Sequence, residues 1–407
     1  MNVLFVHNNF PAQYLHIVRA LADDPDVHMA AIGSSTSQKM NGVRLLKYSL
    51  GNVDVSNTHP FARRFDLECY RAEQVLYALS SLASTGFKPD VIMAHPGWGE
   101  TLPLRTIFPD ARILLYCEFF YGAYDRDVGF DPEFPETGAD GHVALHLKNA
   151  SSLLALADSD IGISPTEWQR STFPKEYQSK ITVIHEGIDV DFVKPKPDAV
   201  LRLASGRELR QTDEVVTFVA RNLEPLRGYH VFMRALPRIM ATRPRAQVVV
   251  IGGDGVSYGA SSPSGTTWKA RFLDETAKQI DRDRIHFTGR LTYADYLRAL
   301  QVSSAHVYLT YPFVLSWSLL EALSAGCVVI GSDTAPVREV LNSKNGLLVP
   351  FFDIEQIAER VIEALTYPGR FRAVRTQARQ TILDQYDLAQ ICLPKIVALL
   401  KNLNLRK

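Results

Sequence analysis

Cysteine is scarce in this sequence: 407 residues contain four, Cys69, Cys117, Cys327 and Cys392, and none lies near another. This spacing argues against a disulfide framework and against a zinc site built from paired cysteines. Two of the four lie in apolar runs, LLYC and CVVIG, that are typical of strands. We therefore predict buried thiols in a protein of a reducing compartment.

An excess of charge of one sign is also missing, because 44 Lys and Arg side chains balance 44 Asp and Glu. A protein dedicated to coating nucleic acid or a membrane needs a summed positive field, so the balance argues against that class. Residues 1–200 nevertheless carry 17 basic and 25 acidic side chains, and the remainder carry 27 and 19. Chance explains this asymmetry, or the second half holds an anion; both explanations stay open here.

Long apolar runs are absent as well. The N-terminal segment MNVLFVHNNF lacks a basic region, and no uncharged apolar stretch has membrane-spanning length. We therefore expect no transmembrane segment and a cytoplasmic protein, with peripheral membrane contact left open. The sequence also lacks a Gly-x-Gly-x-x-Gly after its first strand, a Gly-Lys-Ser/Thr phosphate loop and a His-Glu-x-x-His motif. Dehydrogenase, kinase and zinc protease functions thereby lose their main support.

What the sequence does contain is a repeated alternation of short apolar, β-branched runs with segments of helical period. This alternation indicates βαβ units and parallel sheets. The predicted strands of the first half are residues 2–7, 29–33, 90–95, 113–117, 161–164 and 181–185. Those of the second half are residues 215–220, 247–252, 284–289, 305–309, 327–332 and 346–350.

The change between the two halves falls in a segment rich in Pro and charge, from about 195 to 210, which we interpret as a hinge. The predicted fold class is therefore α/β, with two Rossmann-like domains at 1–195 and 205–386. A long Gly- and Ser-rich loop, 252–268, follows one strand, and such loops are usually functional or disordered. Residues 387–403 have near-helical apolar spacing and are predicted to form a terminal helix docked on a core.

Two arginines follow the predicted strand 215–220 in the motif ARNLEPLRG. Arg221 and Arg227 could clamp a diphosphate, because planar guanidinium groups match phosphate oxygens and stay charged. The alternative is that both are solvated, or that one of them pairs with Glu224. Taken alone, the motif slightly favours this structural alternative.

The motif SWSLLEALSAG places serines ahead of an apolar helix. Ser316 and Ser318 are good N-cap residues, and the first amides of such a helix accept a phosphate. Glu321 lies one turn into the helix, where it could accept hydrogen bonds from a ribose. Ser318-x-x-Glu321 is also a capping box, which would explain the glutamate without a ligand.

Three weaker signals lie at other predicted strand ends, where open α/β sheets bind ligands. Each also has a purely structural explanation, as a turn or a hydrogen-bonded residue. Arg290 could help to read a base edge, the loop 7–13 could line an acceptor groove, and two side chains could move protons. The acceptor-side candidates are Asn8, Asn9 and Phe10, and the proton-transfer candidates are His95 and Glu118.

Together these motifs resemble the nucleotide-binding half of the retaining glycosyltransferases of family 4, which have the GT-B fold. The resemblance rests on Arg221 and Arg227-Gly228, Gly252-Gly253, FTG (287–289), and SLLEALSAGCVVIGSD (318–333) followed by Glu339 and NGLLVP (345–350). It covers about residues 180–365 and is weaker over the first half. It implies parallel sheets facing across a deep cleft, an N-terminal acceptor-binding domain, a C-terminal nucleotide-sugar-binding domain, and a final helix (about 387–407) that returns to the N-terminal domain.

The resemblance also implies a reaction. A hexose would move from a nucleotide-diphosphate sugar to an acceptor hydroxyl with retention of anomeric configuration, with no metal and no cofactor besides the donor substrate. The acceptor would be a glycan, a lipid-linked molecule or a small molecule, in glycan, glycoconjugate or polysaccharide biosynthesis. Arg221 and Arg227 would hold the diphosphate and Glu321 the ribose. The implied donor-binding set is completed by Gly253, Arg290, Ser316, Trp317 and Ser318.

Two positions depart from the family pattern. Phe313 stands where the family usually has a second glutamate, and Glu118 stands where a catalytic-site histidine commonly ends a strand. These departures motivate an alternative function, a relative that binds nucleotide sugars but has lost transfer. A sugar-nucleotide epimerase on a similar two-domain fold is the third hypothesis.

Overall fold

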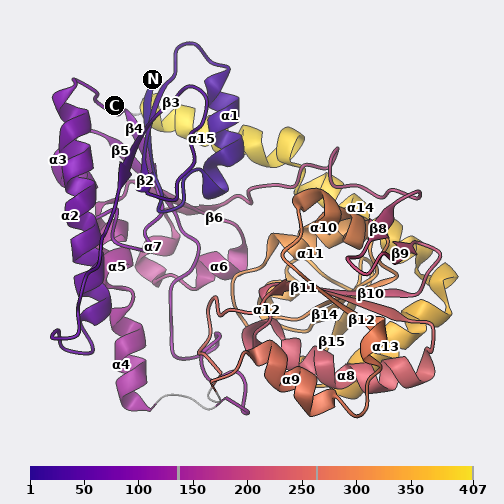
Figure 1. The fold of residues 1–407 in the computed structure, drawn as a ribbon. Helices are drawn as coiled ribbons and strands as arrows, with labels where there is room; N and C mark the ends of the chain where they lie inside the picture. Colours follow the sequence, from indigo (N-terminus) through magenta and orange to yellow (C-terminus); the bar gives the residue numbers. More distant parts are fainter. Residues whose placement is uncertain (135–137, 263–264, 406–407) are drawn as a thin grey trace. The chain divides into compact units, whose positions relative to one another are not determined.

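The structure is a computed structural model that describes residues 1–134, 138–262 and 265–405. Two compact units make up the chain: residues 1–187 with 389–407, and residues 188–388 (Figure 1). The first unit ends before the boundary at residue 195 that the sequence suggested. Residues 263–264 of the predicted long loop and 406–407 of the predicted terminal helix lie outside the described residues.

The first unit is built on a seven-stranded parallel sheet in the order β3-β2-β1-β4-β5-β6-β7. Its middle strands are continuous apolar runs because helices cover both faces. The chain reverses its direction of growth between β1 and β4, which is the topological switch point where such sheets bind ligands. The strands are β1 Asn2–Val6, β2 His28–Ser34, β3 Val43–Tyr48, β4 Val91–Ala94, β5 Arg112–Tyr116, β6 Ile161–Ser164 and β7 Ile181–Val183.

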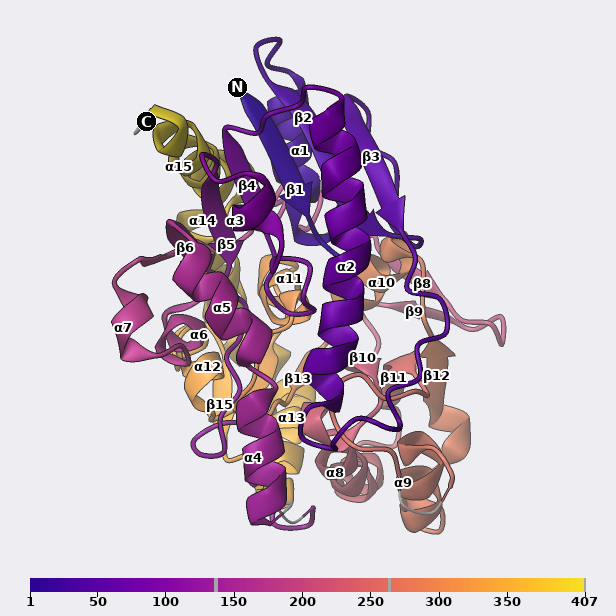
Figure 2. The ribbon, with the colours of Figure 1, turned by 90° about the vertical axis from the view of Figure 1, so that its left-hand side faces the viewer.

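Helices lie on both faces of this sheet. Helices α1 (Leu15–Ala22) and α15 (Leu393–Leu405) pack together on one face. On the other face lies α2 (Arg63–Ser84), which crosses in front of β1–β3 in Figure 2. The shorter helices of this unit are α3 Leu104–Ile107, α4 Ala139–Leu147, α5 Ala150–Asp158, α6 Glu167–Ser171 and α7 Lys175–Gln178.

The chain's last helical segment, Leu388–Leu405, belongs to the first unit from residue 389 onward, so the predicted return of this helix is confirmed. By length and composition alone this segment could cross a membrane, with a mean hydropathy of 1.2. The segment contains Lys395 and Lys401, so it is not the uncharged apolar stretch that the sequence was found to lack. Its inward side nevertheless packs in the core beside β1 and α1, through Ile396, Leu400 and Leu403.

The second unit contains a six-stranded parallel sheet in the order β12-β11-β10-β13-β14-β15. Its switch point lies between β10 and β13, so the residues that follow these two strands are brought to one edge. The strands are β10 Val215–Asn222, β11 Gln247–Gly253, β12 Ile285–Gly289, β13 Ala305–Tyr308, β14 Val329–Ser332 and β15 Leu347–Val349.

Two groups of helices cover this second sheet (Figure 1). The group on one face packs through α8 and consists of α8 Tyr229–Thr242, α9 Trp268–Thr276 and α13 Ile354–Thr366. The group on the other face shares one apolar cluster and consists of α10 Tyr293–Gln301, α11 Trp317–Ser324 and α14 Arg372–Gln385. A short helix, α12 (Ala335–Arg338), follows β14.

Three sequence-based expectations need correction. Strand β3 had not been predicted, because Arg44 and Lys47 interrupt its apolar pattern, as is common in edge strands. The segment interpreted as a hinge contains an antiparallel hairpin of β8 (Val200–Arg202) and β9 (Glu208–Arg210). Cys69 is exposed, whereas the other three cysteines are buried and all four are free.

Candidate functional site

Arg227 lies at the switch point of the second unit, at the end of a 3₁₀ turn, Pro225–Arg227. Gly228 follows with φ of 69°, and a Cβ there would lie 2.3 Å from the Leu309 Cβ, so glycine allows this turn to approach the end of β13. The Arg227 side chain is only 7% exposed. Its Nη1 donates to Thr310 Oγ1 at 2.8 Å and to the Val314 carbonyl at 3.0 Å.

Two aromatic rings flank this guanidinium. The Arg227 Cζ lies 5.6 Å from the ring centre of Tyr258 and 5.7 Å from that of Phe313, and the two rings contact each other. None of the ion pairs among the described residues includes Arg227. Its charge is therefore held by neutral hydroxyl, carbonyl and aromatic groups, which leaves a buried cation without a carboxylate.

The alternative that Glu224 pairs with an arginine is wrong for Arg227. The Glu224 carboxylate is buried and accepts hydrogen bonds from the backbone amides of Ser257 and Gly259, each at 3.2 Å. Glu224 thus fixes the start of the Gly- and Ser-rich loop. The loop in turn brings Tyr258 to Arg227.

Helix α11 begins at the same edge of the sheet. Ser316 is its N-cap, and its side chain accepts from the Ser318 amide at 3.3 Å, while the Ser316 amide donates to the Tyr308 hydroxyl at 2.9 Å. The helix starts at Trp317, so Ser318 is not the N-cap and the predicted capping box does not form. Trp317 is 46% exposed and Ser318 is buried. The first turn of α11 presents the positive end of the helix dipole.

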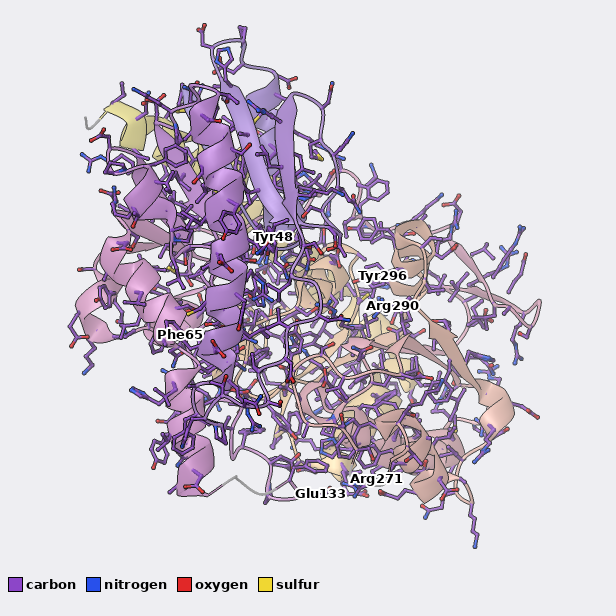
Figure 3. All side chains as sticks on the ribbon, turned by 60° about the vertical axis from the view of Figure 1, so that its left-hand side comes forward. Tyr48, Phe65, Glu133, Arg271, Arg290 and Tyr296 are labelled. Carbon is purple, nitrogen blue, oxygen red and sulfur yellow. The ribbon has the colours of Figure 1, made fainter. Side chains whose placement is uncertain are left out.

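Glu321 faces α10 instead of its own helix terminus. Its two carboxylate oxygens accept hydrogen bonds from the hydroxyls of Tyr293 and Tyr296, each at 2.6 Å. Burial raises the pKa of Glu321, and the two phenol hydrogen bonds oppose that rise. Tyr296 is labelled in Figure 3, where it belongs to α10.

The other donor-side candidates occupy the outer part of this edge. Arg221 is the next-to-last residue of β10 and is exposed, and no described contact joins it to Arg227. At Gly253, which ends β11, an added Cβ would lie 2.5 Å from Asn222 Oδ1 and 3.5 Å from Arg290 Nε. The structure therefore brings Gly253 and Arg290 together; Arg290 follows β12 and is exposed (Figure 3).

In the first unit, His95 and Glu118 follow β4 and β5 and lie together. The His95 Nε2 is 3.3 Å from Glu118 Oε2, and the Gly97 amide donates to His95 Nδ1 at 3.0 Å. Because Nδ1 accepts this hydrogen bond, the neutral imidazole carries its hydrogen on Nε2, and Nε2 donates a hydrogen bond to Glu118. Glu118 also accepts from Gln13 Nε2 at 3.4 Å, and its side chain is 32% exposed. Glu118 is the solvent-facing member of this pair.

His7 is a residue of this site that the sequence did not single out. It follows β1, it is buried, and its ring lies 5.3 Å from that of His95 across the β1/β4 switch point. Burial lowers the pKa of His7 to about 3, with the nearby His95 adding to the effect. A polar residue directly after the first strand was the available signal, because the switch point collects such residues.

The acceptor-side candidates divide into two kinds. Asn8 Oδ1 lies 3.3 Å from the Tyr48 hydroxyl, and Asn9 is exposed and accepts from Thr36 Oγ1 at 3.0 Å. Phe10, in contrast, is 0% exposed and packs on Phe5 in the core. The prediction that its side chain lines an acceptor site is therefore wrong.

A cavity of about 590 Å³ lies elsewhere in the second unit, among residues that precede β13 and β14. Two of its arginines donate to backbone carbonyls: Arg375 to that of Gly326 at 2.8 Å and Arg379 to that of Val193 at 2.7 Å. Since ligands of open α/β sheets bind at the opposite, carboxyl edge, this cavity is not the candidate site. Among the described residues, no group of three or more His, Cys, Asp and Glu could hold a metal ion.

Comparison with known proteins decides the family. Residues 25–193 match the family described as glycosyl transferase family 4 group, and residues 204–381 match glycosyl transferases group 1. The chain belongs to family 4 of the glycosyltransferases. The resemblance found in its sequence is thus confirmed, and the two parallel-sheet units of this glycosyltransferase are those of the GT-B fold.

Curated relatives match this glycosyltransferase over part of their length. D-inositol 3-phosphate glycosyltransferase of Mycobacteroides abscessus is 27% identical over 47% of this chain and 40% of its own length. A GDP-mannose-dependent monoacylated alpha-(1-6)-phosphatidylinositol monomannoside mannosyltransferase of Corynebacterium glutamicum is 25% identical over 53% of this chain and 55% of its own. The matched regions therefore span about half of these relatives.

Solved structures share the fold over the whole chain. Sucrose-phosphate synthase of Thermosynechococcus elongatus has a TM-score of 0.73 at 17% identity and covers 100% of both chains. Anabaena HepE, in complex with UDP and glucose, has a TM-score of 0.67 at 14% identity and covers 99% of this chain and 100% of its own. At these identities the likeness concerns the fold.

Proposed function

We propose that this protein transfers a hexose from a nucleotide-diphosphate sugar to an acceptor hydroxyl, with retention of anomeric configuration and without a metal. The observation that carries the proposal is Arg227, a buried cation at the β10/β13 switch point with no carboxylate partner among the described residues. A buried charge of this kind is costly unless a ligand of opposite charge compensates it. A diphosphate supplies that charge.

The proposed chemistry follows from the same groups. The bond between the sugar C1 and the diphosphate oxygen breaks, the acceptor oxygen bonds to C1 on the same face, and the acceptor proton passes to the departing phosphate oxygen. Negative charge grows on the leaving group, and the Arg227 guanidinium with the first amides of α11 stabilises it. In the first unit Glu118, which is hydrogen-bonded to His95, accepts a hydrogen bond from a second, non-reacting hydroxyl of the acceptor and so orients it.

The nucleotide-sugar donor is supported by the family and by the UDP-bound structure of Anabaena HepE. The acceptor belongs to the glycans, lipid-linked molecules or small molecules that such enzymes glycosylate. We place the reaction in glycan, glycoconjugate or polysaccharide biosynthesis. A cytoplasmic location is part of the proposal, because sugar nucleotides are substrates there.

The test is product analysis with the purified chain. UDP-, GDP- and ADP-hexoses are each incubated with a panel of sugar, polyol and lipid-linked acceptors, and products are identified by mass spectrometry and the anomeric configuration by NMR. One donor should give a product that keeps the donor's configuration, and Arg227→Met should abolish it. An inverted product refutes retention, and the absence of any product with every donor and acceptor refutes the transfer.

A second candidate function, binding without transfer, is favoured by Phe313. This buried ring stands beside Arg227 and offers no polar group to a donor sugar. Tight binding of one sugar nucleotide, together with neither transfer nor hydrolysis in the same assay, would support that candidate.

A further inference from the structure

Both carboxylate oxygens of Glu321 accept hydrogen bonds from side chains of the protein. The carboxylate is 7% exposed, and each of its oxygens accepts one phenol hydroxyl at 2.6 Å, from Tyr293 and from Tyr296. The two tyrosines are three residues apart on α10 and therefore face the same side of that helix. None of the ion pairs among the described residues includes Glu321. This buried carboxylate is thus held by neutral donors alone.

The two tyrosines differ in their surroundings. Tyr296 packs against the apolar cluster shared by α10, α11 and α14, and burial raises its pKa strongly. Tyr293 is 49% exposed, and its ring stacks on Phe192, which is exposed too, with ring centres 5.7 Å apart. Tyr293 can therefore turn away from Glu321 without opening the core, whereas Tyr296 cannot.

A ligand that hydrogen-bonds to Glu321 must displace one of these phenol hydroxyls or share an oxygen with it. A carboxylate oxygen left without a donor in a buried site costs the full desolvation penalty, so an exchange of one hydroxyl for another is far cheaper than a vacancy. A ribose presents such hydroxyls. Displacing the hydroxyl of Tyr293, the exposed partner, disturbs the packing of the core less than displacing that of Tyr296.

We propose that Tyr293 is a stand-in ligand of Glu321 that leaves when a ribose hydroxyl of the donor binds, and that Tyr296 is a positioning residue that holds the other oxygen in both states. This inference rests on the proposed function, since it takes a ribonucleotide as the ligand. It assigns opposite effects to the two tyrosines: Tyr293 competes with the nucleotide for Glu321, and Tyr296 orients Glu321 for nucleotide binding.

The experiment measures binding of a nucleoside diphosphate by calorimetry to the wild type, Tyr293→Phe and Tyr296→Phe. Each protein is titrated with the ribonucleotide and with its 2′-deoxy and 3′-deoxy analogues. Tyr367→Phe, which alters an exposed tyrosine far along the chain, is the matched control. Thermal unfolding of each variant reports whether it folds.

Tyr293→Phe keeps the ring and its stacking but removes the competing hydroxyl. It should bind the ribonucleotide roughly two- to tenfold more tightly, with little gain for the deoxy analogue that lacks the hydroxyl taken by Glu321. Tyr296→Phe should bind the ribonucleotide about tenfold more weakly. A purely structural role for the two tyrosines would instead weaken binding of all three nucleotides alike in both variants.

A pH series gives an independent readout of Tyr296. Its hydrogen bond opposes the rise in the pKa of Glu321, so Tyr296→Phe should move the acid limb of ribonucleotide binding to higher pH. The other titratable groups acting on this network are Asp189, near Tyr293, and the buried Cys327 thiol, near Tyr296. Neither is altered by the substitution.

The outcomes separate the inference from the function on which it rests. A wild-type protein that binds no nucleoside diphosphate overturns both. Wild-type binding combined with unchanged or weakened ribonucleotide affinity in Tyr293→Phe overturns the inference alone. Because Tyr293 lies at the surface, its variant should fold and decide the matter even where Tyr296→Phe does not.

Discussion

Replacing Arg227 with methionine separates a structural from a functional explanation of this buried cation. Methionine keeps a long, flexible side chain without the charge. The change removes the hydrogen bonds to Thr310 Oγ1 and the Val314 carbonyl, worth about 1 kcal/mol each. It also removes the desolvation penalty of an unpaired ion, which is several kcal/mol. The free energy of unfolding of the ligand-free variant should therefore stay within about 1 kcal/mol of the wild type or rise.

The affinity for a nucleoside diphosphate should change far more. The hydrogen bonds of Arg227 to described residues use only Nη1, so Nε and Nη2 remain for phosphate oxygens. Two charge-assisted hydrogen bonds of about 1.5–3 kcal/mol each amount to about 3–6 kcal/mol. Since every 1.4 kcal/mol is tenfold, Kd should rise at least roughly a hundredfold.

The assay pairs calorimetry with urea unfolding. UDP, GDP, ADP and the three matching nucleosides are titrated into the wild type and Arg227→Met, with Arg370→Met as an exposed control. The diphosphates should lose affinity for Arg227→Met, and the nucleosides should not. An Arg227→Met variant that keeps wild-type nucleotide affinity but loses more than about 3 kcal/mol of stability would refute the reasoning, since it would mark the arginine as structural.

Acid should destabilise the first unit through His7, whose pKa burial lowers to about 3. Below about pH 6.5 His7 of the unfolded chain takes up a proton, while His7 of the folded protein stays neutral. The free energy of unfolding therefore falls as pH drops from about 6.5 to 3, by about 2 kcal/mol at pH 5. In urea titrations His7→Asn should reduce this dependence on pH, and an unchanged dependence would contradict the prediction. Gly253→Ala places a Cβ 2.5 Å from Asn222 Oδ1, so we expect the free energy of unfolding to fall by about 1–3 kcal/mol and nucleotide binding to weaken. An unaltered Tm and Kd would show that the residues at this edge of the sheet can move to accommodate the Cβ. Glu118→Gln should lower the transfer rate roughly a hundredfold with unchanged donor affinity, because a misoriented acceptor reacts slowly. Equal rates would remove Glu118 from the acceptor site.

Most of both sheets was predictable because strands covered on both faces are short apolar runs. Residues 247–252 and 327–332 show this pattern in the sequence, and strands β11 and β14 lie there. The strands that escaped prediction lack it: β3 is an edge strand with two basic residues, and the β8–β9 hairpin has only three residues in each strand.

The site was less predictable because its decisive contacts join residues far apart in the chain. Glu224 is three positions from Arg227, yet its carboxylate binds the amides of a loop that begins some thirty residues later. The capping-box pattern at Ser318 and Glu321 matched the sequence rule, but the helix begins one residue before Ser318. The phenols that bind Glu321 follow no local pattern, so only the packing of α10 on α11 reveals them.

The central claim is that the β10/β13 edge of the second unit binds the diphosphate of a sugar nucleotide. Crystals of the protein soaked with UDP, GDP and ADP test it most directly. We expect density for one of them, with phosphate oxygens within hydrogen-bond distance of the Arg227 guanidinium and the first amides of α11, and with the ribose at Glu321. A nucleotide bound elsewhere, or density at this edge without any contact to Arg227, would contradict it.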